Sequence, residues 1–179
     1  MADDVAADLA RLLNRLMLPA NRGALCAPVI AVAPSGVDGQ TYPVLNVLSM
    51  VGPVTAARLA EYIGIDRSGT SRYADRLEAA GLVKRTTDSL DRRVTLLSLT
   101  PKGVRVIEKL NATLTDHLRS LTAAWPDGSA AGLAAGLEML LDGPATPVAR
   151  LGTAPSPPRS TRRVQPGARG SRRAAVPAN

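Results

Sequence analysis

Residues 53–103 constrain the fold of this chain more than any other stretch of its sequence. The first half of the stretch predicts two short helices joined by a tight turn, because Gly64 readily takes the positive φ that ends a helix. Ala60, four residues earlier, is small enough for the two helices to approach closely. Ile65 then returns to the core, and Asp66 is of a residue type that caps helix N-termini. The pattern predicts a helix-turn-helix.

The second helix of this pair is polar on one face and apolar on the other. Tyr73, Ala74 and Leu77 recur at helical spacing and predict its buried face. A helix with arginine and serine near its N-terminus, placed after a helix and a tight turn, has the form of a DNA recognition helix. Arginine is the commonest specific reader of guanine, and serine bonds bases or phosphates. The candidate DNA contacts, with a solvated polar face as the alternative, are Arg67, Ser68, Ser71 and Arg72.

Three further residues beside this face are candidates for DNA contact. Arg76 lies one turn further along the helix and is expected to meet a phosphate or an acid such as Asp75 or Glu78. Thr55 and Arg58 begin the preceding helix, where backbone N–H groups favour phosphate. For these two, ordinary capping and solvent exposure are the alternative.

The second half of the stretch predicts a β-hairpin. Two strand-like runs, 82–87 and 94–99, flank the polar segment 88–93. A hairpin with a basic tip, placed directly after a helix-turn-helix, makes a winged helix whose tip can reach phosphates or a minor groove. Arg92 and Arg93 are the candidate contacts at this tip, and a solvated charged turn is the alternative.

An ordered set of short motifs runs through these residues. It comprises Ser71-Arg72, Leu77-Glu78-x-x-Gly81-Leu82-Val83, Asp88-x-x-Asp91-Arg92-Arg93 and Leu97-Ser98-Leu99-Thr100-x-x-Gly103. In this set the stretch resembles the MarR (multiple antibiotic resistance regulator) family of winged-helix transcription factors. The resemblance implies that Asp91 orients the following arginine through a salt bridge rather than touching DNA. Leu90 departs from the arginine or proline common before that aspartate, which bears on how the tip is exposed.

The sequence on either side of the winged helix predicts further helices. Apolar residues at helical spacing mark helices over 3–18, about 41–50, 101–122 and 129–142, and Pro19 and Gly23 are expected to end the first. Residues 19–39 form an apolar connection interrupted by proline and glycine, without an assignment. The predicted fold class is therefore mostly α with a small β-hairpin wing.

The long helix carries more apolar surface than a small wing domain needs for its own core. Pairing 3–18, 101–122 and 129–142 with a second copy would bury the surplus, and this is the dimer that the resemblance implies. We therefore expect residues 1–142 to form a MarR-like domain, a winged helix-turn-helix with N- and C-terminal dimerisation helices.

The net charge of +7 comes from the last part of the chain. Residues 143–179 hold seven arginines, many prolines and no acid, and they predict a disordered Arg/Pro-rich tail. Residues 1–142 are neutral overall, but 55–105 hold ten basic residues against six acidic ones. This polarity is expected of a domain with one DNA-facing side.

Other classes of function have little support in the sequence. With a single histidine, His117, a single cysteine, Cys26, and no glycine-rich phosphate loop, we expect no enzyme, no cofactor and no metal site. An acidic N-terminus and an apolar stretch (23–37) broken by two prolines predict no secretory signal and no membrane span. One cysteine fits a reducing cytoplasm.

The sequence therefore favours a cytoplasmic, homodimeric MarR-like regulator, a repressor that binds a palindromic operator in double-stranded DNA. The resemblance implies that a small aromatic or phenolic ligand releases it by binding between the dimerisation helices and the winged domain, and Tyr42 and Tyr62 are candidate lining residues. One alternative is an architectural protein that binds DNA nonspecifically through the tail. Another is a redox sensor built on Cys26, as in some relatives, although no nearby charge lowers the pKa of this thiol and we expect it to be buried and inert.

Overall fold

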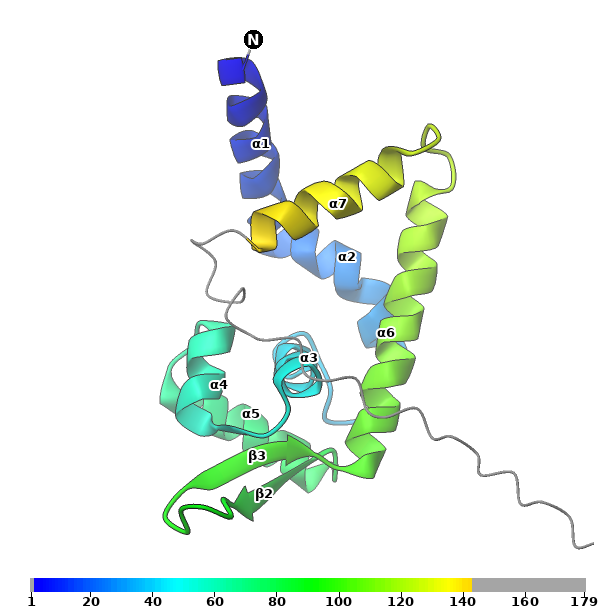
Figure 1. The fold of residues 1–179 in the computed structure, drawn as a ribbon. Helices are drawn as coiled ribbons and strands as arrows, with labels where there is room; N and C mark the ends of the chain where they lie inside the picture. The colour runs from blue at the N-terminus through cyan, green and yellow to red at the C-terminus, as the bar shows by residue number, and fades with distance from the viewer. Residues whose placement is uncertain (1, 143–179) are drawn as a thin grey trace, which may run out of the picture.

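The computed structural model describes residues 2–142, and the predicted tail at 143–179 lies outside the described residues. The fold consists of helices with a small antiparallel sheet at one end of the molecule (Figure 1), which confirms the predicted fold class. The elements, in chain order, are α1 (Ala2–Met17), α2 (Pro19–Ala31), α3 (Tyr42–Val51), β1 (Val54–Thr55), α4 (Ala56–Ile63), α5 (Arg67–Ala79), β2 (Val83–Thr87), β3 (Thr95–Leu99), α6 (Pro101–Thr122) and α7 (Ser129–Leu141).

Helices α4 and α5 form the expected helix-turn-helix. Gly64 ends α4 with φ +74°, a left-handed conformation that glycine adopts without steric cost. The Asp66 carboxylate accepts a hydrogen bond from the Gly69 N–H at 2.7 Å and so caps α5. Ala74 and Leu77 are fully buried and hold α5 against the core, so the polar face of α5 points to solvent.

The wing is part of a three-stranded sheet in the order β1-β3-β2. β2 pairs with β3 from Val83 opposite Leu99 to Thr87 opposite Thr95, and this is the expected hairpin. β1 is a two-residue strand on the other side of β3, with Val54 opposite Leu97. The sequence does not predict β1, because two residues carry no periodicity and this strand exists only through its pairing with β3.

The unassigned connection contains a helix, and one prediction is wrong here. Gly23 does not end the first helix: α1 ends at Met17, and Gly23 lies inside α2. Pro19 stands in the first turn of α2, where its missing N–H has no partner to lose, so it begins a helix as readily as it ends one. Val29, fully buried, ties α2 to the core.

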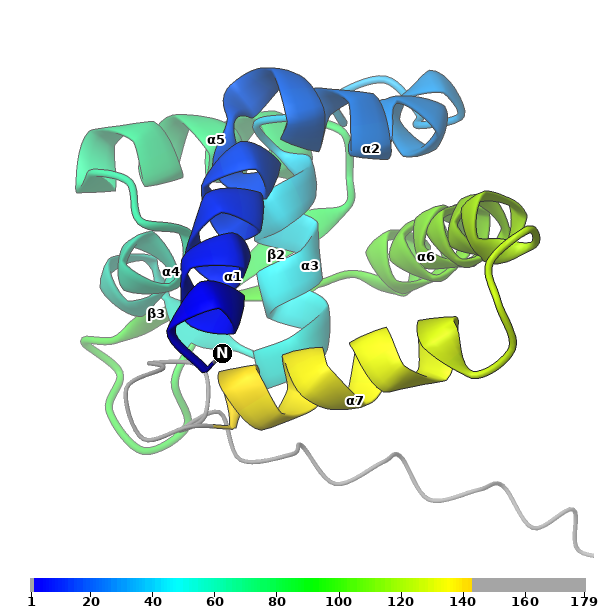
Figure 2. The same ribbon diagram turned by 90° about the horizontal axis from the view of Figure 1, so that it is seen from above.

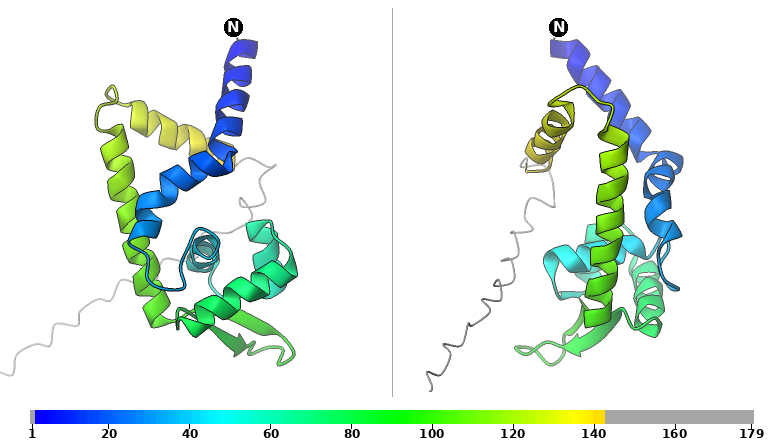
Figure 3. Two further views of the ribbon diagram at one scale, coloured as in Figure 1. Left: turned by 180° about the vertical axis from the view of Figure 1, so that it is seen from behind. Right: turned by 90° about the vertical axis from the view of Figure 1, so that its right-hand side faces the viewer.

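One apolar core joins the helix-turn-helix to the long helix. Its largest fully buried side chains come from α3, α4, α5, α6 and the start of the hairpin, and they include Leu45, Leu59, Leu77, Leu82 and Leu110. Helix α6 leaves this core and runs away from the hairpin, and α7 folds back from its far end (Figures 1 and 3). The view from above shows α7 running from the far end of α6 across the molecule (Figure 2).

Helices α1 and α7 leave large apolar side chains in solvent. α7 has no buried residue within its bounds. Among the exposed large apolar side chains of α1, the exposed fractions run from 47% for Leu16 to 68% for Met17. Figures 1 and 3 place both helices at the end of the molecule opposite the wing. The exposed apolar surface and the wing are therefore well separated.

The start of α6 is docked on the turn that follows α5. Thr100 caps α6, and its N–H donates to the Leu82 carbonyl oxygen at 2.9 Å while its hydroxyl donates to the Gly81 carbonyl oxygen at 2.7 Å. Gly103 sits so close that a Cβ added to it would lie 2.0 Å from the Leu82 oxygen. The contact fixes α6 relative to the end of α5, and it accounts for a glycine at this position.

Candidate nucleic-acid interface

Four arginines of the winged helix form no ion pair within the described residues, although the charge of one of them, Arg72, contributes to lowering the pKa of Asp66. Arg67 and Arg72 lie on the exposed face of α5, and Arg92 and Arg93 lie at the tip of the hairpin. All four are exposed, and none takes part in an ion pair within residues 2–142. Unpaired guanidiniums are the side chains that bond phosphate and guanine. This part of the molecule therefore offers cations on two neighbouring elements.

The two serines of α5 differ in what they offer. The Ser68 hydroxyl donates to the Asp66 carboxylate, so it belongs to the helix cap. This hydrogen bond, with that from the Gly69 N–H, lowers the pKa of Asp66. Ser71, one turn further, is exposed, and within the described residues its hydroxyl has no hydrogen-bond partner. Ser71 is thus the serine whose hydroxyl faces outward.

Arg85 fastens the wing to α5. This residue of β2 pairs with Asp75 at 2.6 Å and also with Glu78, both on α5. Two carboxylates on one guanidinium restrain all three side chains, and a network of this kind holds geometry better than an isolated surface pair. The spacing between the polar face of α5 and the hairpin is therefore fixed. The sequence shows Arg85 only as one more basic residue of a strand.

Arg76 has a partner that the sequence does not predict. Its guanidinium pairs with Asp38, at 2.6 Å, and not with Asp75 or Glu78. Asp38 lies in the loop between α2 and α3, and its other carboxylate oxygen accepts the N–H groups of Gln40 and Thr41 at 2.9 Å each. The loop is thereby tied to the C-terminal part of α5. Arg76 therefore meets an acid, as expected, but the acid is Asp38 rather than Asp75 or Glu78, both of which pair with Arg85.

The Asp38 carboxyl is held in its charged form. Partial burial by itself raises the pKa of Asp38, but the hydrogen bonds from Arg76, Thr41 and Gln40 outweigh it and lower the pKa to about 2. In the unfolded chain the pKa is 3.8. The charged carboxylate therefore stabilises the fold fully above about pH 4, and this contribution is lost as the pH falls through about 2.

We expect Asp38→Asn to lower the free energy of unfolding by about 1 kcal/mol at neutral pH, because the Asp38 side chain is 41% exposed and solvent screens its pairing with Arg76. The substituted amide keeps an oxygen that can accept the loop N–H groups. The gap between the wild type and the variant in urea unfolding should shrink between about pH 4 and about pH 2. A gap that stays constant over this range would contradict the assignment.

Thr55 and Arg58 are occupied within their own helix. The Thr55 hydroxyl accepts the Arg58 N–H at 3.3 Å and caps α4. The Arg58 guanidinium pairs with Glu61, donates to the Tyr62 hydroxyl at 3.3 Å and lies 5.2 Å from the centre of that ring. Thr55 is therefore an ordinary cap and Arg58 is exposed to solvent, as the alternative for these two residues has it, and Arg58 in addition pairs within its own helix.

Hydrogen bonds within the turn shape the wing tip. The Asp88 carboxylate accepts the N–H groups of Leu90 and Asp91, at 2.7 and 3.2 Å. Asp91 accepts the backbone N–H of Arg93 at 2.9 Å, and within residues 2–142 it forms no salt bridge. The implied salt bridge to the following arginine is therefore wrong: Asp91 acts on the backbone of the tip, and the two guanidiniums stay free.

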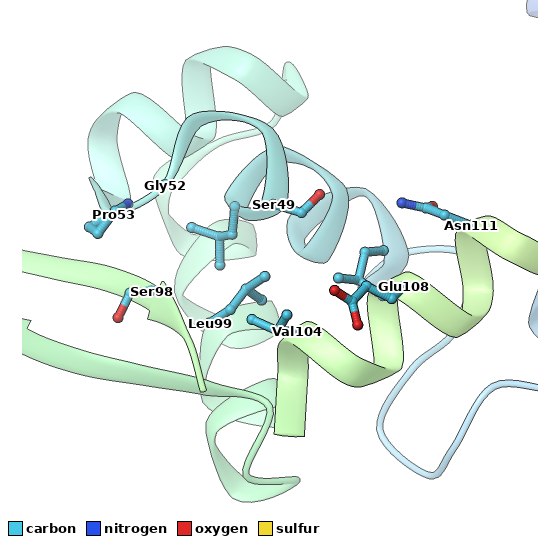
Figure 4. Close-up of a pocket in the computed structure, with 10 residues that line it drawn as sticks. Ser49, Gly52, Pro53, Ser98, Leu99, Val104, Glu108 and Asn111 are labelled. Atoms are coloured by element: carbon cyan, nitrogen blue, oxygen red, sulfur yellow. The ribbon is translucent and has the colours of Figure 1, made fainter. Parts of the chain in front are cut away.

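A pocket of about 510 Å³ lies between α3, β3 and the first half of α6 (Figure 4). Neither Tyr42 nor Tyr62, the two candidate lining residues, lines it. Tyr42 is buried, which raises the pKa of its phenol, and it donates to Asn111 at 3.3 Å. The lining comes from α3, the segment after it, β3 and α6, and consists of Leu48, Ser49, Gly52, Pro53, Ser98, Leu99, Val104, Ile107, Glu108 and Asn111.

The described residues offer little to other kinds of site. Within 2–142 no three histidine, cysteine or acidic side chains gather as metal ligands would. None of the described helices combines the length and the apolar character that crossing a membrane requires. Cys26 is a free thiol on α2, half-buried rather than buried as expected, and His117 is half-buried on α6.

Known proteins share both the motif and the fold. The model of the MarR family matches residues 35–94. The HTH-type transcriptional regulator PapX of Escherichia coli is 32% identical over 88 residues, which are 48% of this chain and 54% of PapX. This chain thus spans about half the length of the curated relatives it matches.

Solved structures extend the likeness beyond the winged helix. A MarR family protein from Bacillus stearothermophilus superposes with a TM-score of 0.66 at 24% identity, over 78% of this chain and 95% of that one. RV1404 from Mycobacterium tuberculosis superposes with a TM-score of 0.64 at 27% identity, over 84% of this chain and 99% of its own. The winged helix of this chain therefore matches the MarR family of transcriptional regulators, and the fold over most of the chain is that of MarR family proteins.

Proposed function

We propose that this protein regulates transcription by binding a specific site in double-stranded DNA through its winged helix. The observation that carries the proposal is the set of exposed, unpaired arginines on α5 and the wing tip, Arg67, Arg72, Arg92 and Arg93. Arg85 fixes these two elements to one another, so a helix in a major groove sets where the tip meets the adjacent minor groove or backbone. This function requires the compartment that holds the DNA, and we propose a cytoplasmic location.

We propose further that residues 1–142 act as a homodimer on a palindromic operator. Support comes from the apolar side chains that α1 and α7 leave exposed, among them Val5, Leu9, Leu133 and Leu137. Large apolar side chains gathered at one end of a molecule mark an interaction site. A second copy that covered it would leave both wings uncovered and related by two-fold symmetry, as a palindrome requires.

The pocket between α3, β3 and α6 is the candidate site for a ligand that releases the DNA. Leu48, Leu99 and Ile107 offer apolar contact, and Glu108 and Asn111 offer acceptors. No basic residue lines the pocket, and Glu108 forms no ion pair within the described residues. A neutral phenol, whose O–H donates to the Glu108 carboxylate, suits this lining better than an aromatic acid does. By filling the space, it would favour a spacing of the two wings that no longer fits the operator, and the protein would act as a repressor.

The test is fluorescence anisotropy of the full chain, titrated into the DNA upstream of its own coding sequence and into a shuffled duplex of equal composition. At about 0.15 M salt, where nonspecific contacts are weak, we expect the upstream DNA to bind at least about 1,000-fold more tightly. A matched variant carries glutamine at the seven arginines of residues 143–179. Its selectivity should persist.

The outcome that contradicts the proposal is equal affinity for the two duplexes, lost entirely when the seven arginines are changed. That result would support the alternative, an architectural protein that binds any DNA through its basic tail, because counterion release alone does not depend on sequence.

A further inference from the structure

The basic tip of the wing also carries one large, exposed apolar side chain. Leu90, in the turn between β2 and β3, is 97% exposed. The next highest value among the large apolar residues in 2–142 is 79%, for Met139 on α7. Leu90 is therefore the most exposed large apolar side chain of the described residues, and it stands two residues before Arg92, which the proposed function places against DNA.

The exposure of Leu90 is built into the turn. The Asp88 carboxylate accepts the Leu90 N–H at 2.7 Å, while the Asp88 N–H donates to the Val94 carbonyl oxygen at 2.9 Å and the Val94 N–H donates to that of Asp91, also at 2.9 Å. These bonds close the loop from within and leave the side chain of Leu90 outside it. The tip is therefore an ordered turn that presents an apolar group.

A second copy of the chain does not account for this group. The apolar surface that a dimer would cover lies on α1 and α7, at the end of the molecule opposite the hairpin (Figures 1 and 3). The immediate neighbours of Leu90 are polar or charged, and Arg92 and Arg93 stand exposed two and three residues further on. Guanidiniums beside an apolar group suit a DNA groove, because phosphates line the edges of the groove and stacked bases form its interior.

We propose that Leu90 enters the minor groove beside the site of α5 and presses as an apolar wedge against a base step, while Arg92 and Arg93 hold the flanking phosphates. This inference rests on the proposed function. Apolar side chains that enter a minor groove partly unstack two neighbouring base pairs. The free-energy cost of this unstacking is lowest at flexible pyrimidine–purine steps. Leu90 thus adds selectivity for a deformable step to the sequence read by α5.

The position of the wedge follows from contacts already described. Arg85 ties β2 to Asp75 and Glu78 of α5, so the tip cannot shift freely once α5 occupies its groove. A wedge carried on a restrained hairpin meets the same base step in every complex. This is what selectivity for one step requires.

The test compares Leu90→Ser with wild-type full-length protein on DNA from upstream of its coding sequence. Hydroxyl-radical protection first locates the minor-groove step under the wing, and this step is then varied from TA to GG. We expect the wild type to prefer TA about tenfold, and Leu90→Ser to bind the TA duplex about tenfold more weakly and to lose the preference. The fluorescence of 2-aminopurine placed at this step should increase when the wild type binds, because the base unstacks. It should not increase when Leu90→Ser binds.

Arg92→Gln is the matched comparison at the same tip. It should lower the slope of log affinity against log salt by about 1 per wing, whereas Leu90→Ser should leave the slope unchanged, because a leucine releases no counterions. Since Leu90 is 97% exposed, its replacement should not alter the melting temperature.

The outcomes separate the two proposals. If the wild type binds its upstream DNA selectively but Leu90→Ser matches it in affinity, step preference and 2-aminopurine signal, the wedge alone is overturned. If Leu90→Ser instead changes the oligomeric state in size-exclusion chromatography, the partner of Leu90 is protein, and the wedge is again overturned. If the wild type shows no selectivity at all, the proposed function fails, and the wedge fails with it.

Discussion

Replacing Gly103 by alanine is expected to destabilise the fold by about 3 kcal/mol or more, which corresponds to a fall of roughly 10 °C in melting temperature. The added Cβ would lie 2.0 Å from the Leu82 carbonyl oxygen and 3.0 Å from the carbonyl carbon. Both atoms belong to backbone, and the oxygen also accepts the Thr100 N–H at 2.9 Å. No flexible side chain can give way, so α6 must move off the turn that follows α5.

The matched control is Gly23→Ala. Gly23 also lies inside a helix, but nothing stands within 4 Å of a Cβ added there. Alanine favours a helix over glycine by up to about 1 kcal/mol, so this variant should be neutral or slightly more stable. Thermal unfolding of the three proteins checks both results. Equal melting temperatures for Gly103→Ala and the wild type would show that the close approach of α6 to Leu82 is not a constraint.

Features of the winged helix that depend on neighbours in sequence were predicted correctly. The turn at Gly64 and the cap at Asp66 need only a few consecutive residues, and both are confirmed. The capped start of α6 at Thr100 is likewise local, because its cap and the proline after it are adjacent in the chain. Such signals carry their own physical cause and need no tertiary partner.

Features that depend on a distant partner were missed or wrong. Helix α2 contains proline and glycine, and its burial at Val29 against the core decides the structure there. The pairing of Arg76 with Asp38 joins residues 38 positions apart, and nothing in the sequence selects this acid over two closer ones. Long-range packing and pairing override local preference at such positions.

The candidate site shows the same division. The exposed face of α5 was predicted from helical spacing, and the four exposed arginines were all among the candidates. Which arginines are free and which are paired depends on acids elsewhere in the fold, and this sorting required the structure. Their contacts with DNA remain a prediction.

That sorting leads to the strongest functional prediction. Arg72→Glu is expected to weaken binding to the upstream DNA at least about 100-fold. The change removes a guanidinium that is free to bond a base or a phosphate, and it places a carboxylate against the DNA backbone, in both subunits of a dimer. Because Arg72 is exposed and forms no ion pair within the described residues, the free energy of unfolding should stay within about 0.5 kcal/mol of wild type.

Lys109→Glu is the matched control, since it makes the same charge change at an exposed position of α6. If net charge alone governed the affinity, both variants would weaken binding equally. If α5 reads the operator, anisotropy titrations should show a large loss for Arg72→Glu and less than about a threefold loss for Lys109→Glu at about 0.15 M salt, where distant charges are screened. An equal effect of the two would remove the reason for treating α5 as the recognition helix, because only contact at short range distinguishes these two positions.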